Sequence, residues 1–461
     1  LLTHSGKLAP LIKLMMIPDS WSKRSKTVPK NHQDFFNFLN STIEPWDGPA
    51  AICATDAKWV LASSDRNGLR PLRYTITSDN LFFAGSETGM IKIPEENIIE
   101  KGKLGPGQII AIDLKKGKLF KDKEIKDLLA KDYKKYNKQI IDLEKKISSE
   151  DEKPNFLSED LRKRQYLSGL SIEDLELILH PMAEEGKEAS GSMGDDTPVA
   201  VLSSHFRPVS HYFRQNFSQV TNPPIDSLRE NKVMSLKTRF GNLGNILDFD
   251  NLTEENIYVL DSPILTNSQF KKFKKFFSKK VRVIDCTFDI EGSLKERIES
   301  IRKEAETAVR EGSTCLVLSD KNISNQKASI PSILTVGAVH SHLVKHGLRG
   351  YCSLNVECSD AMDTHSFAIL IGVGATTVNP YLAIDSIYQR FEKRLFGKSE
   401  FETCVNKFKK SIDSGLLKIM SKMGISVISS YRGGCNFEAV GLSRAIVSDY
   451  FPGMSSRISG I

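Results

Sequence analysis

The sequence predicts a multidomain protein of mixed α/β and α+β class. Its 461 residues are enough for about three domains. Short β-rich runs divided by turn residues fill roughly the first 120 residues, and strand patterns alternate with amphipathic helix patterns from residue 160 to residue 396. Because strand, helix, glycine and strand in succession build parallel sheets, the second region predicts a mainly parallel sheet.

Composition excludes several classes of protein. Hydrophobic residues make up 40% of the chain and charged residues 26%, which is typical of a globular protein and excludes a mainly disordered one. No apolar run reaches the roughly 18 residues of a membrane span, so we expect no membrane partner. The net charge of +7 is spread over lysine-rich segments, so we expect no nucleic-acid partner. The seven scattered cysteines favour reduced thiols in a cytoplasmic protein.

The two ends of the chain suggest an internal piece of a longer polypeptide. The first residue is Leu1, and the segment that follows it lacks the charged region and cleavage site of a signal peptide. The chain stops at Ile461 within patterned sequence. We therefore expect further sequence on both sides.

The first 120 residues are expected to form short strands after an opening helix. Apolar residues at 8–16 predict that helix, and 35–39 form a second helical patch. Strands are expected at residues 50–54, 58–63, 72–77, 81–84 and 109–113. Asn67-Gly68 and Pro106-Gly107 predict turns, because glycine and asparagine tolerate positive φ and proline presets a turn.

Residues 123–160 are predicted to form a charged helical linker. The apolar positions are sparse in this part of the chain: Leu128, Ile140, Leu143 and Ile147. Such a pattern is typical of an amphipathic, solvated helix. The lysine run could contact nucleic acid, but the interleaved Asp and Glu residues favour a solvated face.

Residues 161–396 carry the alternating pattern. Candidate buried strands are 257–260, 281–285, 315–319, 351–356 and 367–373. The clearest helix is 293–310, which Gly312 would cap. Its apolar face is Leu294, Ile298, Ile301, Ala305 and Val309.

Residues 191–230 carry the strongest punctuation in the chain. Three aromatic residues have the spacing of one helix face: Tyr212, Phe213 and Phe217. The double proline Pro223-Pro224 then predicts that the helix ends near Thr221. The stretch also offers three carboxylates: Asp195, Asp196 and Asp226. It has no nucleophile paired with a base, so we interpret it as a scaffold or a domain contact.

One short segment has the composition of an anion or flavin site. It offers two ammonium groups, a hydroxyl and a glycine that would let backbone N–H groups approach a ligand. The candidate cofactor-binding residues are Lys418, Met420, Ser421, Lys422, Met423 and Gly424. A packed loop with solvated lysines explains the same residues.

The remaining candidates carry little chemistry. The glycines of 371–375 match only part of a dinucleotide fingerprint and favour a strand-to-helix turn. Asp195-Asp196 is more typical of a turn or cap than of a metal site. Three histidines lie on one helix-like segment without an acidic ligand pair, and two cysteines lack further cluster ligands: His340, His342, His346, Cys352 and Cys358. We therefore expect no metal site.

Three long motifs identify a family. GSMGDDTP at 191–198, QVTNPPID at 219–226 and KIMSKMGI at 418–425 occur in this order in one chain. With them, the sequence closely resembles the large (α) chain of glutamate synthase over essentially all of its length. DRNGLRP at 65–71, SETG at 86–89 and LGPG at 104–107 resemble the later half of that family's class II glutamine amidotransferase domain.

The resemblance implies a domain order. Residues 1–122 would be the C-terminal part of an amidotransferase domain with the layered sheet of the N-terminal-nucleophile (Ntn) type. The linker 123–160 would lead into the glutamate synthase central domain, 161–396, with its mainly parallel sheet. Residues 397–461 would be the truncated entry to a (β/α)8 FMN barrel, and the candidate residues 418–424 would lie near FMN or 2-oxoglutarate.

The resemblance also implies an activity for the full enzyme. Glutamine is hydrolysed at an N-terminal cysteine whose own amino group serves as the base. The ammonia passes through a tunnel and condenses with 2-oxoglutarate, and FMN with a 3Fe-4S cluster supplies the electrons that give a second glutamate. Electrons would come from an NADPH-dependent small (β) subunit carrying FAD and further Fe–S clusters, from NADH or from ferredoxin. We expect an oligomer.

No catalytic residue is assigned within this chain. The resemblance places the nucleophilic cysteine upstream of Leu1 and the cluster cysteines downstream of Ile461, so we expect the isolated chain to be inactive and free of FMN and cluster. Residues 356–366 depart from the family pattern ETGEAREVHH and are expected to pack differently. The substituted positions are Cys358, Ser359, Met362 and Ser366. The alternative is a non-catalytic scaffold or regulatory paralogue that retained the central domain.

Overall fold

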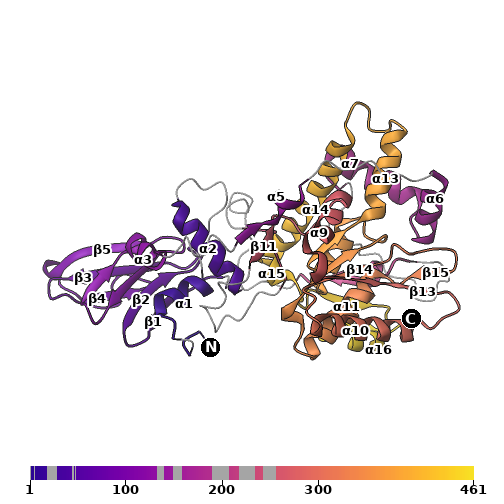
Figure 1. Cartoon of the computed structure of the whole chain (residues 1–461). Coiled ribbons are helices and arrows are strands. Elements are labelled where there is room, and N and C mark those ends of the chain that lie inside the picture. Colours follow the sequence, from indigo (N-terminus) through magenta and orange to yellow (C-terminus); the bar gives the residue numbers. More distant parts are fainter. Residues whose placement is uncertain are drawn as a thin grey trace.

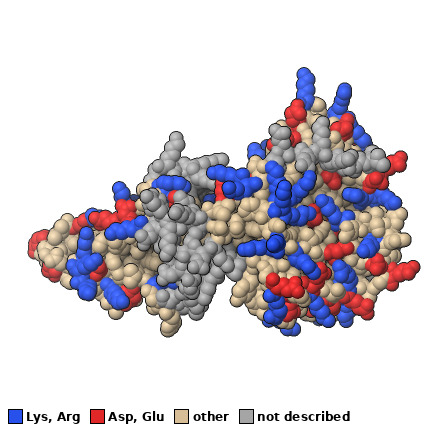
Figure 2. Space-filling view, viewed as in Figure 1, with Lys and Arg blue, Asp and Glu red and all other residues tan. Residues whose placement is uncertain are grey.

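The computed structural model of the chain describes residues 2–4, 6–17, 28–43, 46, 48–131, 140–148, 158–188, 207–217, 234–241 and 256–460. Figure 1 shows a β-rich N-terminal body, drawn in indigo to magenta, and a larger α/β body that holds the C-terminal half of the chain. Figure 2 shows basic and acidic side chains distributed together over the visible face of the larger body. Within the described residues, no helix has both the length and the apolar character needed to span a bilayer.

The N-terminal body confirms the predicted opening helix and short strands. Helix α1 (Ala9–Met16) packs against helix α2 (Lys30–Thr42), which is longer than the predicted patch. Two antiparallel sheets follow, in the orders β1-β2-β6-β7 and β4-β3-β5. Their strands are β1 (Ala51–Thr55), β2 (Trp59–Ser64), β3 (Leu72–Thr77), β4 (Phe82–Gly85), β5 (Ile98–Leu104), β6 (Ile109–Asp113) and β7 (Lys118–Phe120). The sequence patterns missed β5 and β7.

The solvated helix predicted for the linker 123–160 is wrong for the part of the linker that the structure describes. Helix α3 (Asp122–Leu129) is followed by β8 (Ile140–Asp142) and the short helix α5 (Leu143–Ile147). Strand β8 pairs in parallel with β11 (Ile257–Leu260), which pairs with β10 (Thr238–Phe240). Leu143 and Ile147 are fully buried against the aromatic face of helix α9 (Asn267–Phe277). Leu143 and Ile147 therefore belong to a hydrophobic core, whereas a solvated linker would leave them exposed.

The larger body is built on a parallel sheet, as predicted, and three of its four strands lie at predicted positions; the predicted strand 257–260 is β11 of another sheet. The order of the parallel sheet is β12 (Val281–Asp285), β14 (Cys315–Ser319), β16 (Ser353–Glu357) and β17 (Thr377–Asn379), with every neighbouring pair parallel. All five residues of β14 are buried. Leu316 and Leu318 belong to the main core, while Cys315 and Val317 face the cluster around α9. Burial on both faces explains the continuous apolar run that predicted this strand.

Helices cover both faces of this sheet (Figure 1). Helix α10 (Leu294–Arg310) confirms the predicted helix, with Ser293 as its N-cap, and packs on α11 (Ser332–Lys345), which packs on α16 (Arg444–Tyr450). The described part of this body also contains α6 (Ser158–Leu167), a π-helix (Asp174–Leu179), α7 (His180–Glu185), α12 (Thr364–Gly372), α13 (Tyr381–Glu392), α14 (Phe401–Met423) and α15 (Ile428–Tyr431). The body also contains a two-stranded sheet of β13 (Thr287–Asp289) and β15 (Lys327–Ser329).

The strand predicted at residues 367–373 is a helix. Asp363 begins α12 by accepting a hydrogen bond from the backbone N–H of Ser366. Every residue of α12 is buried, so the segment shows no helical alternation of apolar and polar residues. The predicted strand-to-helix turn at 371–375 is therefore wrong as well, because this turn leads from α12 into β17. Gly374 occupies it with a φ of 125°.

The helix predicted across Tyr212, Phe213 and Phe217 is also wrong. A short 3-10 helix (Val209–Tyr212) leads into β9 (Phe213–Gln215). Strand β9 pairs antiparallel with β18 (Phe437–Val440), which pairs with β19 (Ser455–Ile458). Phe213 is fully buried and packs edge-on against Phe437 and Phe451. The other residues singled out in 191–230, including Asp195, Asp196, Pro223, Pro224 and Asp226, lie outside the described residues.

Candidate functional site

The six predicted site residues lie at the C-terminal end of helix α14. Met420 is buried in the main core, while Lys418 and Lys422 are exposed. Gly424 ends the helix with a φ of 68°, and its N–H is bonded to carbonyl oxygens of the last turn. A helix C-terminus carries partial negative charge and presents carbonyl groups, so it does not form the N–H cradle that an anion requires. The role of these residues in cofactor binding stays a prediction.

The segment after α14 connects the two bodies of the chain. The guanidinium group of Arg66 donates a hydrogen bond to the Ser426 hydroxyl at 3.2 Å, and both residues are buried. The Ser426 carbonyl accepts from the Ser235 backbone N–H at 2.8 Å. Lys237 reaches Asn37 of α2 at 3.4 Å. The DRNGLRP motif therefore contacts the chain two residues after KIMSKMG.

A rigid turn fixes the position of Arg66. The Asp65 carboxylate accepts hydrogen bonds from the backbone N–H groups of Asn67 (3.1 Å), Leu69 (2.8 Å) and Arg70 (2.9 Å). Gly68 has a φ of 65°, and a Cβ there would lie 2.9 Å from the Pro106 ring. The two predicted turns thus pack against each other, with glycine required at the contact.

Buried carboxylates gather where the parallel strands end. Asp320 follows β14, and its Oδ2 accepts hydrogen bonds from the backbone N–H (3.0 Å) and hydroxyl (2.6 Å) of Ser359, which follows β16. Burial, and then the charge of Asp360, raises the pKa of Asp320 to about 6. A cavity of about 180 Å³ borders Ser359 and Asp360. In α/β proteins this edge of a sheet is the usual place for ligands.

The four positions in this region that were expected to pack differently each have defined surroundings. Ser359 supplies the hydroxyl that bonds Asp320. Cys358 and Met362 are buried in the main core. The Ser366 hydroxyl bonds the Asp363 carboxylate at the start of α12.

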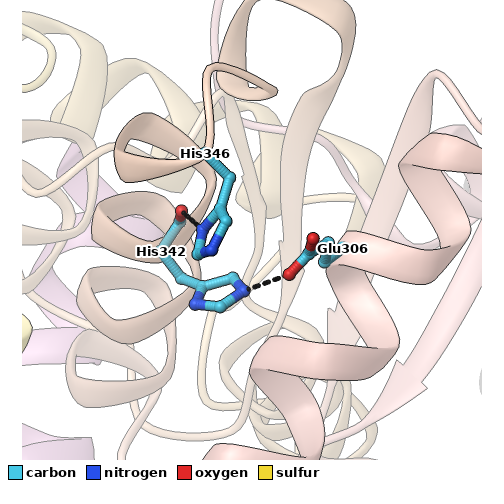
Figure 3. A group of neighbouring side chains, drawn as sticks. All are labelled: Glu306, His342 and His346. Carbon is cyan, nitrogen blue, oxygen red and sulfur yellow. Dashed lines mark hydrogen bonds and ion pairs between the residues drawn. The ribbon is translucent and has the colours of Figure 1, made fainter.

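A second cluster lies at the opposite edge of the sheet, between the last turns of α10 and α11. His342 Nε2 donates to Glu306 Oε2 at 2.8 Å, and His346 Nδ1 donates to the His342 carbonyl at 2.8 Å (Figure 3). One ligand atom from each of these three side chains lies within 4.8 Å of the others. The hydrogen bond from His342, and then that from Arg310, holds the pKa of Glu306 below its ordinary value.

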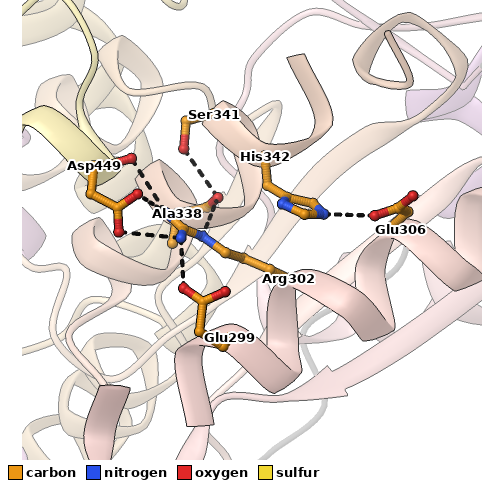
Figure 4. A network of polar contacts seen from close by, with 7 residues as sticks. All are labelled: Glu299, Arg302, Glu306, Ala338, Ser341, His342 and Asp449. Atoms are coloured by element: carbon orange, nitrogen blue, oxygen red, sulfur yellow. Dashed lines mark hydrogen bonds and ion pairs between the residues drawn. The ribbon is translucent and has the colours of Figure 1, made fainter. Parts of the chain in front are cut away.

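A buried arginine joins the same two helices to α16 (Figure 4). Arg302 donates to the Ala338 carbonyl at 3.2 Å, to Glu299 at 2.7 Å and to Asp449 at 3.2 Å. Its guanidinium lies 4.7 Å from the centre of the Tyr450 ring. These contacts fix α10 against α11 and so fix Glu306 relative to the histidines.

A cleft of about 570 Å³ opens beside this network. It is lined by His340 and His342 of α11, by the exposed Cys435 and by Asp449. Burial, and then the charges of Arg349 and Arg432, lowers the pKa of His340 to about 4. His340 therefore lines the cleft as a neutral side chain, and it does not belong to the cluster of Glu306, His342 and His346.

The sequence patterns indicate two members of this cluster and miss the third. The i, i+4 spacing of His342 and His346 has no acidic ligand nearby in the sequence. Glu306 supplies that group from the preceding helix, which packs on α11. Cys352 and Cys358 lie at the two ends of β16 as buried thiols, and burial raises the pKa of both. Among the described residues, the cysteines do not form a cluster of three that could hold iron and sulfide.

Comparison with known proteins gives the family. Residues 163–443 match the model of the glutamate synthase central domain, and residues 1–138 match class II glutamine amidotransferases. The central-domain match extends past the predicted boundary at 396. The predicted boundaries stay predictions.

Curated relatives match the whole chain. The large chain of NADPH glutamate synthase from Azospirillum brasilense is 53% identical over 100% of this chain and 31% of its own length. The corresponding large chain from Bacillus subtilis is 40% identical over 99% of this chain and 30% of its own length. Ferredoxin-dependent glutamate synthase 2 from Synechocystis is 38% identical over 100% of this chain and 31% of its own length.

This chain spans about a third of the length of these relatives. The flavin-binding domain of yeast flavocytochrome b2 is a solved structure that aligns with 67% of this chain and 95% of its own length. The TM-score is 0.33 and the sequence identity is 10%, so this likeness does not define the fold. The central-domain match covers more than half of the 461 residues. The chain therefore belongs to the glutamate synthase family.

Proposed function

We propose that this chain is the part of a glutamate synthase that couples glutamine hydrolysis to glutamate formation. Its relatives are named glutamate synthases, and it matches both the amidotransferase and the central-domain models. In the proposed reaction, glutamine hydrolysis yields one glutamate and ammonia. Addition of that ammonia to 2-oxoglutarate, followed by two-electron reduction, yields the second glutamate. The role of this chain is to hold the two sites in register and guide ammonia between them.

The residues described here do not form a complete site for either proposed cofactor. The candidate FMN residues, Lys418 to Gly424, are divided between the core and the surface at a helix C-terminus. The cysteines within the described ranges offer no cluster of three thiols. Within the described residues, no side chain is assigned a catalytic step through FMN or a 3Fe-4S cluster. We expect the 461-residue chain alone to lack activity.

The contact between Arg66 and Ser426 is the observation that carries this proposal. Arg66 belongs to the amidotransferase match, and Ser426 belongs to the central-domain match. Asp65 holds one side of the contact, and the pairing of Ser235 with residues 426–428 holds the other. A buried cation that bonds across two rigid segments fixes their separation.

Replacing Arg66 with alanine in the full-length enzyme tests the proposal. We expect glutamine hydrolysis to continue while glutamate formation falls, so that more than one glutamine is consumed for each 2-oxoglutarate used. Arg73→Ala is the matched control, because Arg73 is an exposed arginine on β3. An unchanged ratio of glutamine to 2-oxoglutarate in Arg66→Ala would refute the coupling role.

A non-catalytic scaffold or regulatory paralogue is the alternative function. It would retain the same contact between the bodies and would convert no glutamine in the full-length wild-type protein. Relatives are named for NADPH, NADH and ferredoxin, so this assay should be run with each electron donor in turn. Glutamate formation with any one of them excludes the scaffold.

A further inference from the structure

We propose that Glu306, His342 and His346 bind a divalent transition-metal ion of the zinc class. The site lies where the last turns of α10 and α11 meet, and the ion would cross-link these two helices. Two imidazoles and one carboxylate form a common three-ligand set for zinc, with the fourth position left to water. Imidazole favours zinc, cobalt and nickel over magnesium or calcium.

The geometry is close to that of a bound site. Bonds of about 2.0–2.1 Å in a tetrahedron place the ligand atoms about 3.3 Å apart. The three ligand atoms lie within 4.8 Å of one another, so no gap between them has to close by more than about 1.5 Å. His346 is exposed and can make this movement by rotating its side chain.

The hydrogen bonds around the cluster prepare its atoms for a metal ion. A carbonyl oxygen only accepts, so the bond from His346 to the His342 carbonyl places the proton of the neutral ring on Nδ1. The lone pair is then on Nε2. For the ion to bind His342 Nε2, the neutral ring would carry its proton on Nδ1 instead of Nε2. The hydrogen bond from Nε2 to Glu306 Oε2 would then be replaced by a bond from each atom to the ion.

Arg310 acts as the outer partner of the carboxylate. Its guanidinium lies 2.8 Å from Glu306 Oε1, which leaves Oε2 directed toward the histidines. Metal-ligating carboxylates are commonly held in this way by a second hydrogen bond. The same positive charge opposes a dication, so we expect weaker binding than at a site with a free carboxylate.

The rival explanation is a plain hydrogen-bonded clamp between two helices. It accounts for the contact between His342 and Glu306. It does not require His346, whose hydrogen bond to the His342 carbonyl lies within its own helix turn. The test therefore centres on His346, whose exposed side chain can be replaced without disturbing the core.

Cobalt(II) titration of the chelator-treated 461-residue chain, followed by visible absorption, tests the site. Tetrahedral cobalt bound by nitrogen and oxygen gives visible bands, and a thiolate ligand would add a charge-transfer band. The variants are His346→Gln and Glu306→Gln. The controls are His4→Gln, an exposed histidine of the N-terminal body, and Cys435→Ser, because Cys435 lines the neighbouring cleft.

We expect one cobalt ion per chain in the wild type and in both controls, with zinc displacing it and magnesium failing to do so. Each site variant should weaken cobalt binding by at least about tenfold. Removal of a residue that only hydrogen-bonds a metal ligand already lowers metal affinity by about this factor, and these variants remove a ligand itself. Cobalt should also raise the melting temperature of the wild type and leave that of His346→Gln unchanged. Absence of binding, equal binding by His346→Gln, or loss of binding in Cys435→Ser would overturn the proposal.

Discussion

Replacing Asp320 with asparagine should change how the stability of the chain depends on pH. Asp320 is 3% exposed. Burial, and then the nearby Asp360, raises its pKa from 3.8 to about 6. The folded chain therefore holds this proton more tightly than the unfolded chain does. The corresponding stability is fully present below about pH 4 and is lost as the pH rises through about 6.

The size of the effect follows from this pKa difference. A rise from 3.8 to about 6 corresponds to about 3 kcal/mol, at about 1.4 kcal/mol for each pKa unit. Asparagine keeps an oxygen that can accept the hydrogen bonds from Ser359 and from the Ser329 hydroxyl. It has no charge to bury. The variant should therefore gain about 3 kcal/mol relative to the wild type between about pH 4 and pH 7.

Urea unfolding of both chains at about pH 4 and about pH 7 measures this gain, with far-ultraviolet circular dichroism as the signal. The quantity of interest is the difference between variant and wild type at each pH, because other carboxylates contribute equally to both chains. Asp289→Asn is the matched control, since Asp289 is exposed on β13. A difference between Asp320→Asn and wild type that is the same at both pH values would refute the reasoning.

Two further substitutions test the packing around the cleft. Gly374→Ala should cost about 2 kcal/mol or more, because φ is 125° and the new Cβ would lie 2.3 Å from His340 Nδ1; equal urea midpoints for variant and wild type would contradict this. Phe437→Ala should lower the free energy of unfolding by about 3–5 kcal/mol, because the fully buried ring packs on Phe213 and Tyr431. A loss below about 1 kcal/mol, measured by calorimetry, would contradict this, because it would show that neighbouring side chains fill the cavity.

The parallel sheet could be predicted because its signals are local. Strands β12, β14 and β16 are short apolar runs, and α10 shows a clear apolar face that ends before Gly312. Each signal comes from neighbouring residues. Burial on both faces of β14 then requires the helices to cover both sides.

Two other segments could not be predicted correctly because tertiary packing decides their form. Helix α12 is buried on all sides, so its sequence carries no helical period and resembles a buried strand. Strand β8 has only three residues, and its partner β11 lies more than a hundred residues later. Neither periodicity nor propensity reports such a pairing.

The candidate metal cluster shows the same limit. The spacing of His342 and His346 is visible in the sequence. Glu306 stands 36 residues before His342, and only the packing of α10 on α11 brings it within 2.8 Å. Acidic residues in the last turns of α10, the helix that packs on α11, are the candidates for the third ligand, and Glu306 is one of them.

The contact of the two bodies explains why certain motifs are the recognisable ones. In DRNGLRP, Asp65 holds three backbone N–H groups, Gly68 allows the close approach of Pro106, and Arg66 reaches Ser426. KIMSKMGI ends one residue before Ser426. DRNGLRP therefore contacts the chain directly after KIMSKMGI at one buried position. In the proposed function, this contact would set one body against the other, as coupling between two sites requires.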